Sequence, residues 1–227
     1  MIGFTLEEAF EKVGLPLYPQ TILKECYNQP HRLYHNLDHL REMLRWVPKD
    51  HPEVEIVIDA ILFHDIVHAS KPSPKGVNEA LSVAEYIIYN TKTLAFDNPF
   101  SRDGEGSLEY EKRVISAITA TAFHTEDQKY LNEVSKLVLD LDLSTFALPW
   151  NEYLIWKDKI EQENAIIWKD FAPENIKRGR GIFLQTLLKR EKLYYIKTEW
   201  EQQARDNINK DIEYCVYKNT LFLNSFK

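Results

Sequence analysis

Apolar residues recur with the spacing of an amphipathic α-helix along nearly the whole of this 227-residue chain. The sequence contains only 7 glycines, which disfavours a sandwich or barrel with many tight turns. The pattern predicts helices at about 5–14, 19–27, 35–47, 52–69, 77–91, 109–124, 127–143, 149–169, 174–191 and 196–218. Because the connections are short, we predict an all-α fold, with residues 1–227 forming one single-domain helical bundle.

Two segments need a choice between alternatives. Residues 92–108 are polar and rich in turn-forming residues, so we predict a surface loop there. Residues 137–143 alternate as a strand would, but as a helix they place Asp142 inside an apolar stripe and Asp140 on the opposite, solvated face. No partner strand is evident elsewhere, so we predict a helix in which Asp142 faces inward.

Charge and cysteine content narrow the classes of function. A formal net charge of -7, with a pI of about 5.6, argues against binding to long nucleic acids or acidic membranes, but it leaves room for a small phosphorylated substrate. Cys26 and Cys215 lie far apart, which suggests reduced thiols. No signal-like start or long apolar run is present, so a cytoplasmic protein without a membrane partner is expected. The sequence leaves open whether the chain forms a homo-oligomer.

The doublet His64-Asp65 closes an apolar run at residues 54–63. Two strongly polar side chains at this place are costly to bury unless a partner satisfies them. A divalent cation is one such partner, because neutral imidazole and carboxylate are both good ligands. A buried ion pair or a helix-end cap explains the doublet equally well when it is considered alone.

His35 and His39 are four residues apart and are therefore neighbours on one helical face. Met43, Trp46 and Val47 continue the inward stripe from His39, so His39 is expected to face the core. A pair of surface or hydrogen-bonded core histidines is the alternative. The joint pattern favours a metal site, because a histidine, a His-Asp doublet and an aspartate lie on inward faces of different helices.

Several motifs, in order, resemble the HD-domain metal-dependent phosphohydrolases, and most closely a bacterial subgroup of predicted HD-superfamily phosphohydrolases. The matching segments are 30–39 (PHRLYHNLDH), 63–65 (FHD) with Asn78-Glu79 and Ser82-Val83, 119–124 (TATAFH), 140–144 (DLDLS) and 204–207 (ARDN). The resemblance covers about residues 20–210. It implies an HD-type bundle with a metal-site core at about 30–145 and C-terminal helices at about 149–218.

This resemblance implies that His39, His64, Asp65 and Asp142 bind a divalent metal ion. His39 is preferred to His35 because the family's first ligand is followed four residues later by an apolar inward residue, as it is here. His35 is then expected to support a ligand or to face the phosphate. The mixed nitrogen and oxygen donors suit Mn²⁺, Fe²⁺, Co²⁺, Ni²⁺, Zn²⁺ or Mg²⁺, and the number of ions stays open.

Three residues near these motifs are candidates for contact with the substrate or the attacking water. Arg32 carries a planar fork suited to phosphate, and Tyr34 is expected beside the site as a stacking partner. Glu79 is a candidate to orient or deprotonate the water, with an acid that stabilises a helix N-terminus as the alternative.

Three further residues complete the set of candidates. Asp65 is expected to act in catalysis as well as in metal binding. His124 would protonate a leaving oxygen or bind a second metal, unless it only stabilises a helix C-terminus. Arg205 is a candidate for substrate binding, with a structural ion pair as the alternative, whereas Arg178 and Arg180 are expected to be solvated.

The sequence therefore predicts a metal-dependent phosphohydrolase that cleaves a phosphomonoester or phosphoanhydride of a small substrate, with a nucleotide as the favoured class. One alternative is a phosphodiesterase or nuclease acting on cyclic dinucleotides or oligonucleotides. Another is a catalytically inactive sensor module that binds a metal or a nucleotide.

Overall fold

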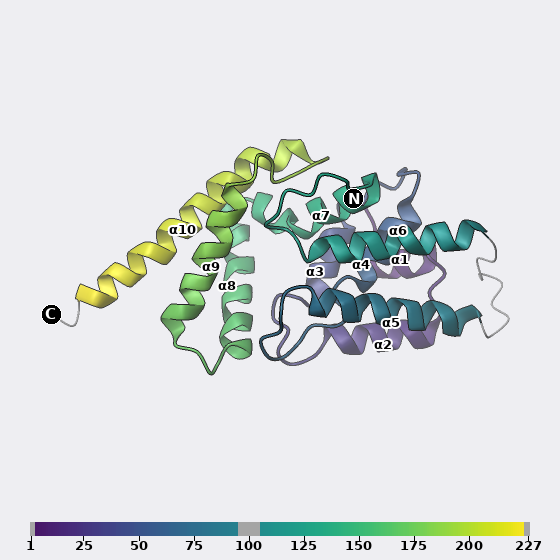
Figure 1. Ribbon diagram of the computed structural model, residues 1–227, viewed down its shortest axis with the longest axis horizontal. Coiled ribbons are helices and arrows are strands. Elements are labelled where there is room, and N and C mark those ends of the chain that lie inside the picture. Colours follow the sequence, from purple (N-terminus) through teal and green to yellow (C-terminus); the bar gives the residue numbers. More distant parts are fainter. Residues whose placement is uncertain (1–2, 95–104, 225–227) are drawn as a thin grey trace.

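The computed structural model describes residues 3–94 and 105–224, and the regular structure in these two segments is entirely helical (Figure 1). The α-helices are α1 (Leu6–Lys12), α2 (Leu17–Tyr27), α3 (Leu37–Leu44), α4 (Val54–Phe63), α5 (Val77–Leu94), α6 (Glu105–Thr121), α7 (Glu133–Asp142), α8 (Trp150–Ile167), α9 (Pro173–Leu188) and α10 (Glu201–Asn224). Short 3₁₀ helices, η1 (Ser144–Ala147) and η2 (Thr198–Trp200), precede α8 and α10. The predicted all-α bundle is confirmed, and so is the choice of a helix over a strand at residues 137–143.

Polar caps fix where several helices begin. Thr5 forms a capping box with Glu8, whose side chain accepts from the Thr5 N–H at 2.8 Å. Asn36 starts α3 by accepting the N–H of the second helical residue, and Asn132 starts α7 by accepting the N–H of Ser135 at 2.8 Å. The helices that carry His39 and Asp142 therefore begin at defined residues.

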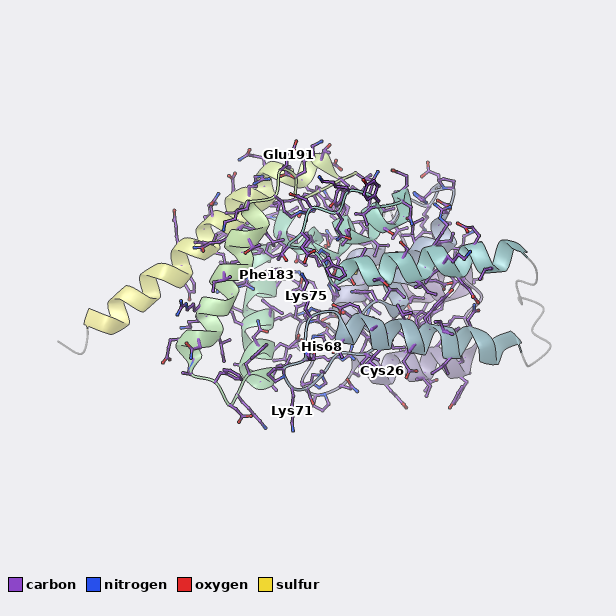
Figure 2. The ribbon with its side chains drawn as sticks, in the orientation of Figure 1. Cys26, His68, Lys71, Lys75, Phe183 and Glu191 are labelled. Carbon is purple, nitrogen blue, oxygen red and sulfur yellow. The ribbon has the colours of Figure 1, made fainter. Side chains whose placement is uncertain are left out.

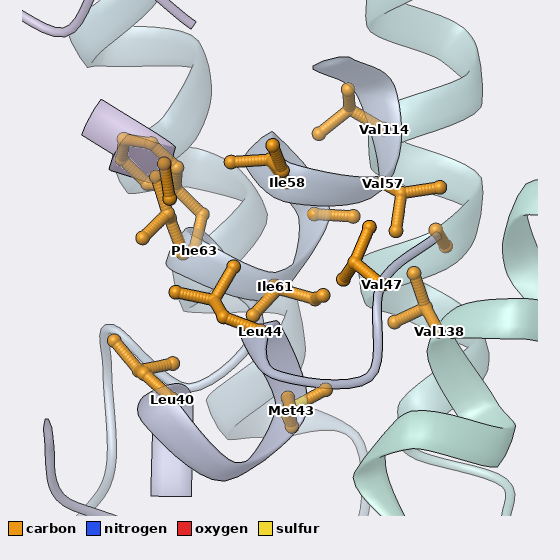
Figure 3. Packing of buried hydrophobic residues seen from close by; sticks show 14 of the residues in the cluster. Leu40, Met43, Leu44, Val47, Val57, Ile58, Ile61, Phe63, Val114 and Val138 are labelled. Atoms are coloured by element: carbon orange, nitrogen blue, oxygen red, sulfur yellow. The ribbon is translucent and has the colours of Figure 1, made fainter. Parts of the chain in front are cut away.

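Helix α4 lies at the centre of the larger apolar core, and nine of its ten residues are buried. A helix that is apolar on all sides needs neighbours around its whole circumference, and α3, α5, α6 and α7 supply them. Figure 3 shows side chains from four of these helices meeting there: Leu40, Met43, Leu44, Val57, Ile58, Ile61, Val114 and Val138. Each buried aliphatic side chain contributes about 1.5–3 kcal/mol of transfer free energy, so this packing fixes α3, α4 and α7 relative to one another.

A second apolar cluster holds the C-terminal helices together. It includes Tyr153 of α8, Leu184 and Leu187 of α9, and Ile208 of α10. Trp200 packs against both clusters and so joins the C-terminal helices to the α1–α7 bundle. Helices α8 and α9 stand beside that bundle in Figure 1, and α10 extends away from it toward the C-terminus.

Several predicted boundaries were wrong. Helix α4 ends at Phe63 instead of reaching residue 69, and α7 begins at Glu133, six residues later than predicted. The predicted loop 92–108 is helical at both ends, since α5 continues to Leu94 and α6 begins at Glu105, and its centre, 95–104, lies outside the described residues.

Cys26 is a half-buried free thiol, and the side chain of Cys215 lies outside the described part of the chain. Within the described ranges, no helix combines the length and apolar character needed to cross a membrane.

Candidate metal centre and its pocket

Three of the predicted ligands meet where α3, α4 and α7 converge. His39 comes from the first turn of α3, His64 follows the last residue of α4, and Asp142 is the last residue of α7. His39 Nε2 lies 3.0 Å from Asp142 Oδ1, and His64 Nε2 lies 3.7 Å from the same oxygen. The three candidate ligand atoms lie within 4.8 Å of one another, so these residues could hold a metal ion.

The protonation of His64 supports this interpretation. His64 Nδ1 lies 2.8 Å from the carbonyl oxygen of Ile61, which can only accept, so Nδ1 carries a proton. In the neutral ring Nε2 then presents a lone pair, and this buried atom has no hydrogen-bond partner among the described residues. Asp65 Oδ2 lies 3.0 Å away. An imidazole lone pair between two carboxylates fits a bound cation, and the backbone contact orients the ring as in known metal sites.

The carboxylates of this cluster require a compensating positive charge. Burial disfavours the charged form of His64, but Asp65 and Asp142 outweigh it and raise the pKa of His64 well above its usual value. Burial would likewise raise the pKa values of the two carboxyl groups, yet the charge of His64 lowers both. The site therefore holds either an extra proton or a cation.

His124 joins this cluster from the turn after α6. Its Nε2 lies 2.7 Å from Asp142 Oδ2, the carboxylate oxygen that does not face His39. Arg190 Nη1 donates to the carbonyl oxygen of His124 at 2.9 Å, which holds the turn in place. His124 thus contacts a candidate ligand, instead of acting only on the dipole at the end of a helix.

A pocket of about 650 Å³ opens over the cluster, between the α1–α7 bundle and the C-terminal helices. Asp65, Asp142, His124 and Glu79 line the end of the pocket near the metal centre. The opposite walls are largely apolar and are formed by Trp156, Ile160, Trp168, Phe171, Ile176 and Phe183. Figure 2 shows Phe183 on α9, at the junction with the bundle.

Tyr34, predicted to contact the substrate, and Glu79, predicted to act on the attacking water, both line this pocket. The hydroxyl of Tyr34 is within 2.9 Å of Thr145 Oγ1, and its ring packs edge-on against Trp156. Glu79 is half-buried, and burial together with the negative charges of Asp65 and Asp142 raises the pKa of its carboxyl group. A carboxylate with a raised pKa is a stronger base than an ordinary surface carboxylate.

Arg32 does not reach the pocket. It is 4% exposed, and its Nη1 and Nη2 donate to the carbonyl oxygens of Asp65 and Ile66 at 2.6 and 2.9 Å. Its Nε donates to Gln29 Oε1 at 3.1 Å. The predicted phosphate contact of Arg32 does not agree with this placement, because the guanidinium binds the carbonyl groups left unpaired at the end of α4 and so positions the His-Asp doublet.

Arg205 is likewise structural. Its Nε donates to Glu201 at 2.6 Å, and its other nitrogens donate to the carbonyl oxygens of Leu188, the last residue of α9, and of Arg190 and Glu191 beyond it. The ion-pair alternative describes this arginine, and the predicted substrate contact does not.

Asp140 is buried, contrary to the expected solvated position. It is 0% exposed and accepts the backbone N–H groups of Tyr195, Ile196 and Lys197 at 2.9, 2.7 and 2.8 Å. The segment between α9 and α10 covers this face of α7, and the local pattern around Asp140 carries no sign of that segment. Asp140 therefore anchors a loop, while Asp142 faces the metal centre.

Arg180 and Lys157 are basic residues of the pocket. Arg180 was expected to be solvated, but its side chain is 8% exposed and it pairs with Asp211 at 2.5 Å. Lys157 pairs with Glu161 at 2.6 Å. Arg178 is exposed, as expected.

A second polar group lies beside the metal centre and contains His35, His68 and Glu163. The sequence interpretation did not single out Glu163, although a signal exists. Glu163 lies on the same inward stripe of α8 as Ile160 and Ile167, so it is an acid within an apolar stripe, as Asp142 is.

The structure thus brings together His39, His64, Asp65, Asp142 and His124, and it places Tyr34, His35 and Glu79 in the adjoining pocket. Compared with known proteins, the sequence matches no family model and no curated protein.

Proposed function

We propose that this chain is a metal-dependent phosphohydrolase that removes the phosphoryl group from a nucleotide carrying one phosphate. The observation that carries the proposal is the buried Nε2 of His64, which faces two carboxylates beside a pocket large enough for a nucleotide. The motifs that resemble the HD-domain phosphohydrolases agree with it.

In this proposal His39, His64, Asp65 and Asp142 hold the ion. A divalent ion bound there would polarise a phosphoryl oxygen and lower the pKa of water. His124 orients Asp142 by binding Oδ2, which leaves Oδ1 directed at the two ligand histidines. Arg32 acts from behind the site by fixing the backbone of Asp65.

The acid-base role falls to Glu79 in this proposal. Glu79 shares the pocket with Asp65 and Asp142, and its carboxylate is free to accept a proton from the attacking water. The raised pKa makes the carboxylate a better base than an ordinary surface glutamate. Water activation therefore needs no residue from outside the pocket.

Charge in the pocket favours one phosphate over several. Lys157 and Arg180 are the permanently cationic side chains among the described residues that line it, and each already contacts a carboxylate. A triphosphate would bring several negative charges into a pocket whose cations are neutralised. A phosphomonoester brings fewer charges, which the ion can balance.

The far walls favour an aromatic group on the substrate. Trp156 and Phe183 expose ring surface to the pocket, and Asn164 and Asn175 add hydrogen-bonding groups. Base–aromatic stacking contributes about 1–3 kcal/mol, so a nucleobase would gain from this wall. These features support a nucleoside monophosphate over a small sugar phosphate.

The test is a phosphate-release assay on purified protein with Mn²⁺, Co²⁺, Mg²⁺ or Zn²⁺. The panel contains nucleoside mono-, di- and triphosphates and a phosphodiester. We expect release from monophosphates, and we expect Asp65→Ala to abolish it while the helical circular-dichroism signal is retained. Asp38→Asn is a matched control, because Asp38 is an exposed carboxylate next to His39 whose ion pairs are with Arg41 and Lys159, away from the metal centre.

Turnover that survives Asp65→Ala would contradict the proposal. Faster cleavage of the diester would support the phosphodiesterase alternative. Tight nucleotide binding without hydrolysis under every metal would support the sensor alternative.

A further inference from the structure

His35, His68 and Glu163 bring three donor groups together from three separate parts of the chain. His35 precedes α3, His68 lies in the loop after α4, and Glu163 belongs to α8. His35 Nδ1 contacts Glu163 Oε1, and His68 Nε2 lies 3.6 Å from the same oxygen. All three donor atoms lie within 4.8 Å of one another. Figure 2 shows His68 where the bundle meets the C-terminal helices.

Glu163 is held in the orientation of a ligand. Its side chain is 0% exposed, and its Oε2 accepts the N–H groups of Tyr34 and His35 at 2.7 and 3.0 Å. These bonds leave Oε1 directed at the two imidazole rings. Carboxylate ligands of metal ions in proteins are commonly fixed by hydrogen bonds of this kind.

An ion pair between His35 and Glu163 explains only part of this arrangement. The ring of His68 stacks on His35 with centroids 4.4 Å apart, and its Nδ1 is buried without a hydrogen-bond partner among the described residues. Its Nε2 faces Glu163 Oε1 at 3.6 Å, which is too long for a hydrogen bond. An imidazole nitrogen and a carboxylate oxygen that face each other without a hydrogen bond can both bind the same cation.

This group shares no residue with the first metal centre. The ring of His35 lies 5.8 Å from that of His39, and His35 also lines the pocket. A cation held by His35, His68 and Glu163 would therefore border the same pocket through different ligands.

We propose that His35, His68 and Glu163 form a second divalent-cation site, with zinc as the favoured ion. Two histidines and one glutamate are a donor set that zinc uses when one coordination position stays open. Because His35 lines the pocket, a phosphate oxygen or water in the pocket would be able to reach an ion held there. The site is independent of the proposed function.

The test is zinc stoichiometry on protein first stripped with a chelator. Zinc content is measured by elemental analysis after removal of excess ion at about pH 8, and zinc binding is followed by calorimetry. We expect two ions per chain for the wild type, and one for either His68→Phe or Asp142→Asn. The double variant is expected to bind none. His68→Phe retains an aromatic ring between His31 and His35, so the fold is expected to persist.

Two further variants complete the design. Glu163→Gln is expected to lose the same ion as His68→Phe. His31→Gln is the matched control, because His31 stacks on His68 but belongs to neither cluster, and it is expected to retain two ions.

One ion in the wild type, lost in Asp142→Asn and kept in His68→Phe, would overturn this inference and leave the proposed function standing. Two ions retained in His68→Phe would also overturn it. A wild type that binds no zinc, manganese or cobalt would remove both proposals.

Discussion

Asp140 and Asp142 lie two residues apart on α7. Replacing the first is expected to affect stability, and replacing the second is expected to affect metal binding. Asp140 accepts three backbone N–H groups from the segment that leads into α10. Asp142 contacts His39 and His124 through separate oxygens. Substitution of the first should reduce stability, and substitution of the second should abolish metal binding.

The structure sets the size of each effect. A net hydrogen bond contributes about 1–1.5 kcal/mol, so Asp140→Ala should lower the free energy of unfolding by about 3–4 kcal/mol. Asp140→Asn keeps one carbonyl oxygen and should lose about half as much. Asp142→Asn also keeps an acceptor oxygen, so without metal its free energy of unfolding should fall by less than about 1.5 kcal/mol.

Bound metal is expected to reverse the order of stability of Asp140→Asn and Asp142→Asn. At a free ion concentration about 100 times Kd, a bound ion stabilises the folded state by about 2.7 kcal/mol. The wild type and Asp140→Asn should show this gain, and Asp142→Asn should not. Because His68→Phe lacks the second proposed site, the comparison is made in that background.

The assay is urea denaturation followed by circular dichroism, once with chelator and once with Mn²⁺ or Zn²⁺. If folded Asp140→Asn lost the metal-dependent gain, or Asp142→Asn kept it, the separate roles assigned to the two carboxylates would be refuted.

Four other variants test neighbouring residues of the site and the pocket. Arg32→Lys removes the guanidinium fork and should lower the free energy of unfolding by about 2 kcal/mol and weaken metal binding, measured by denaturation and calorimetry. Arg205→Lys should cost a similar amount of stability with metal affinity unchanged, and an equal loss of affinity would contradict its structural role. Burial lowers the pKa of His35, but Glu163 outweighs it and raises that pKa from 6.5 to about 9. The stabilisation from this proton is complete below pH 6.5 and lost as the pH rises to 9, so metal-free wild type should lose about 3 kcal/mol more than His35→Gln over that range. Parallel denaturation curves for the two would refute the assignment. Trp156→Ala should raise the KM for a nucleoside monophosphate about tenfold in steady-state assays, and an unchanged KM would exclude stacking on this ring.

Local sequence was sufficient where the periodicity of a single helix decided the outcome. His39 and Asp142 each lie in an apolar stripe of their own helix, and His64 ends an apolar run. A polar residue in such a position must face the core, whatever the rest of the fold is. The same reasoning would have found Glu163 on α8.

Predictions from the local sequence were wrong where a side chain binds backbone groups of another segment. Arg32 and Arg205 bind carbonyl groups beyond helix ends, and Asp140 binds N–H groups more than fifty residues away. Backbone groups are present at every residue, so no pattern of side chains marks the ones that will serve as partners. The roles predicted for Arg32 and Arg205 therefore pointed to the substrate, and Asp140 was predicted to be solvated, while the observed contacts of all three are structural.

The sequence by itself determined the helical class of the chain and the inward positions of His39, His64 and Asp142, because helical periodicity and the cost of burying polar groups act within one helix. Only the tertiary structure decided which of these residues share a site, which arginines are committed to backbone, and that α8 and α9 wall a pocket. Those outcomes depend on distances between segments far apart in the chain, and such distances are set by packing of the whole core.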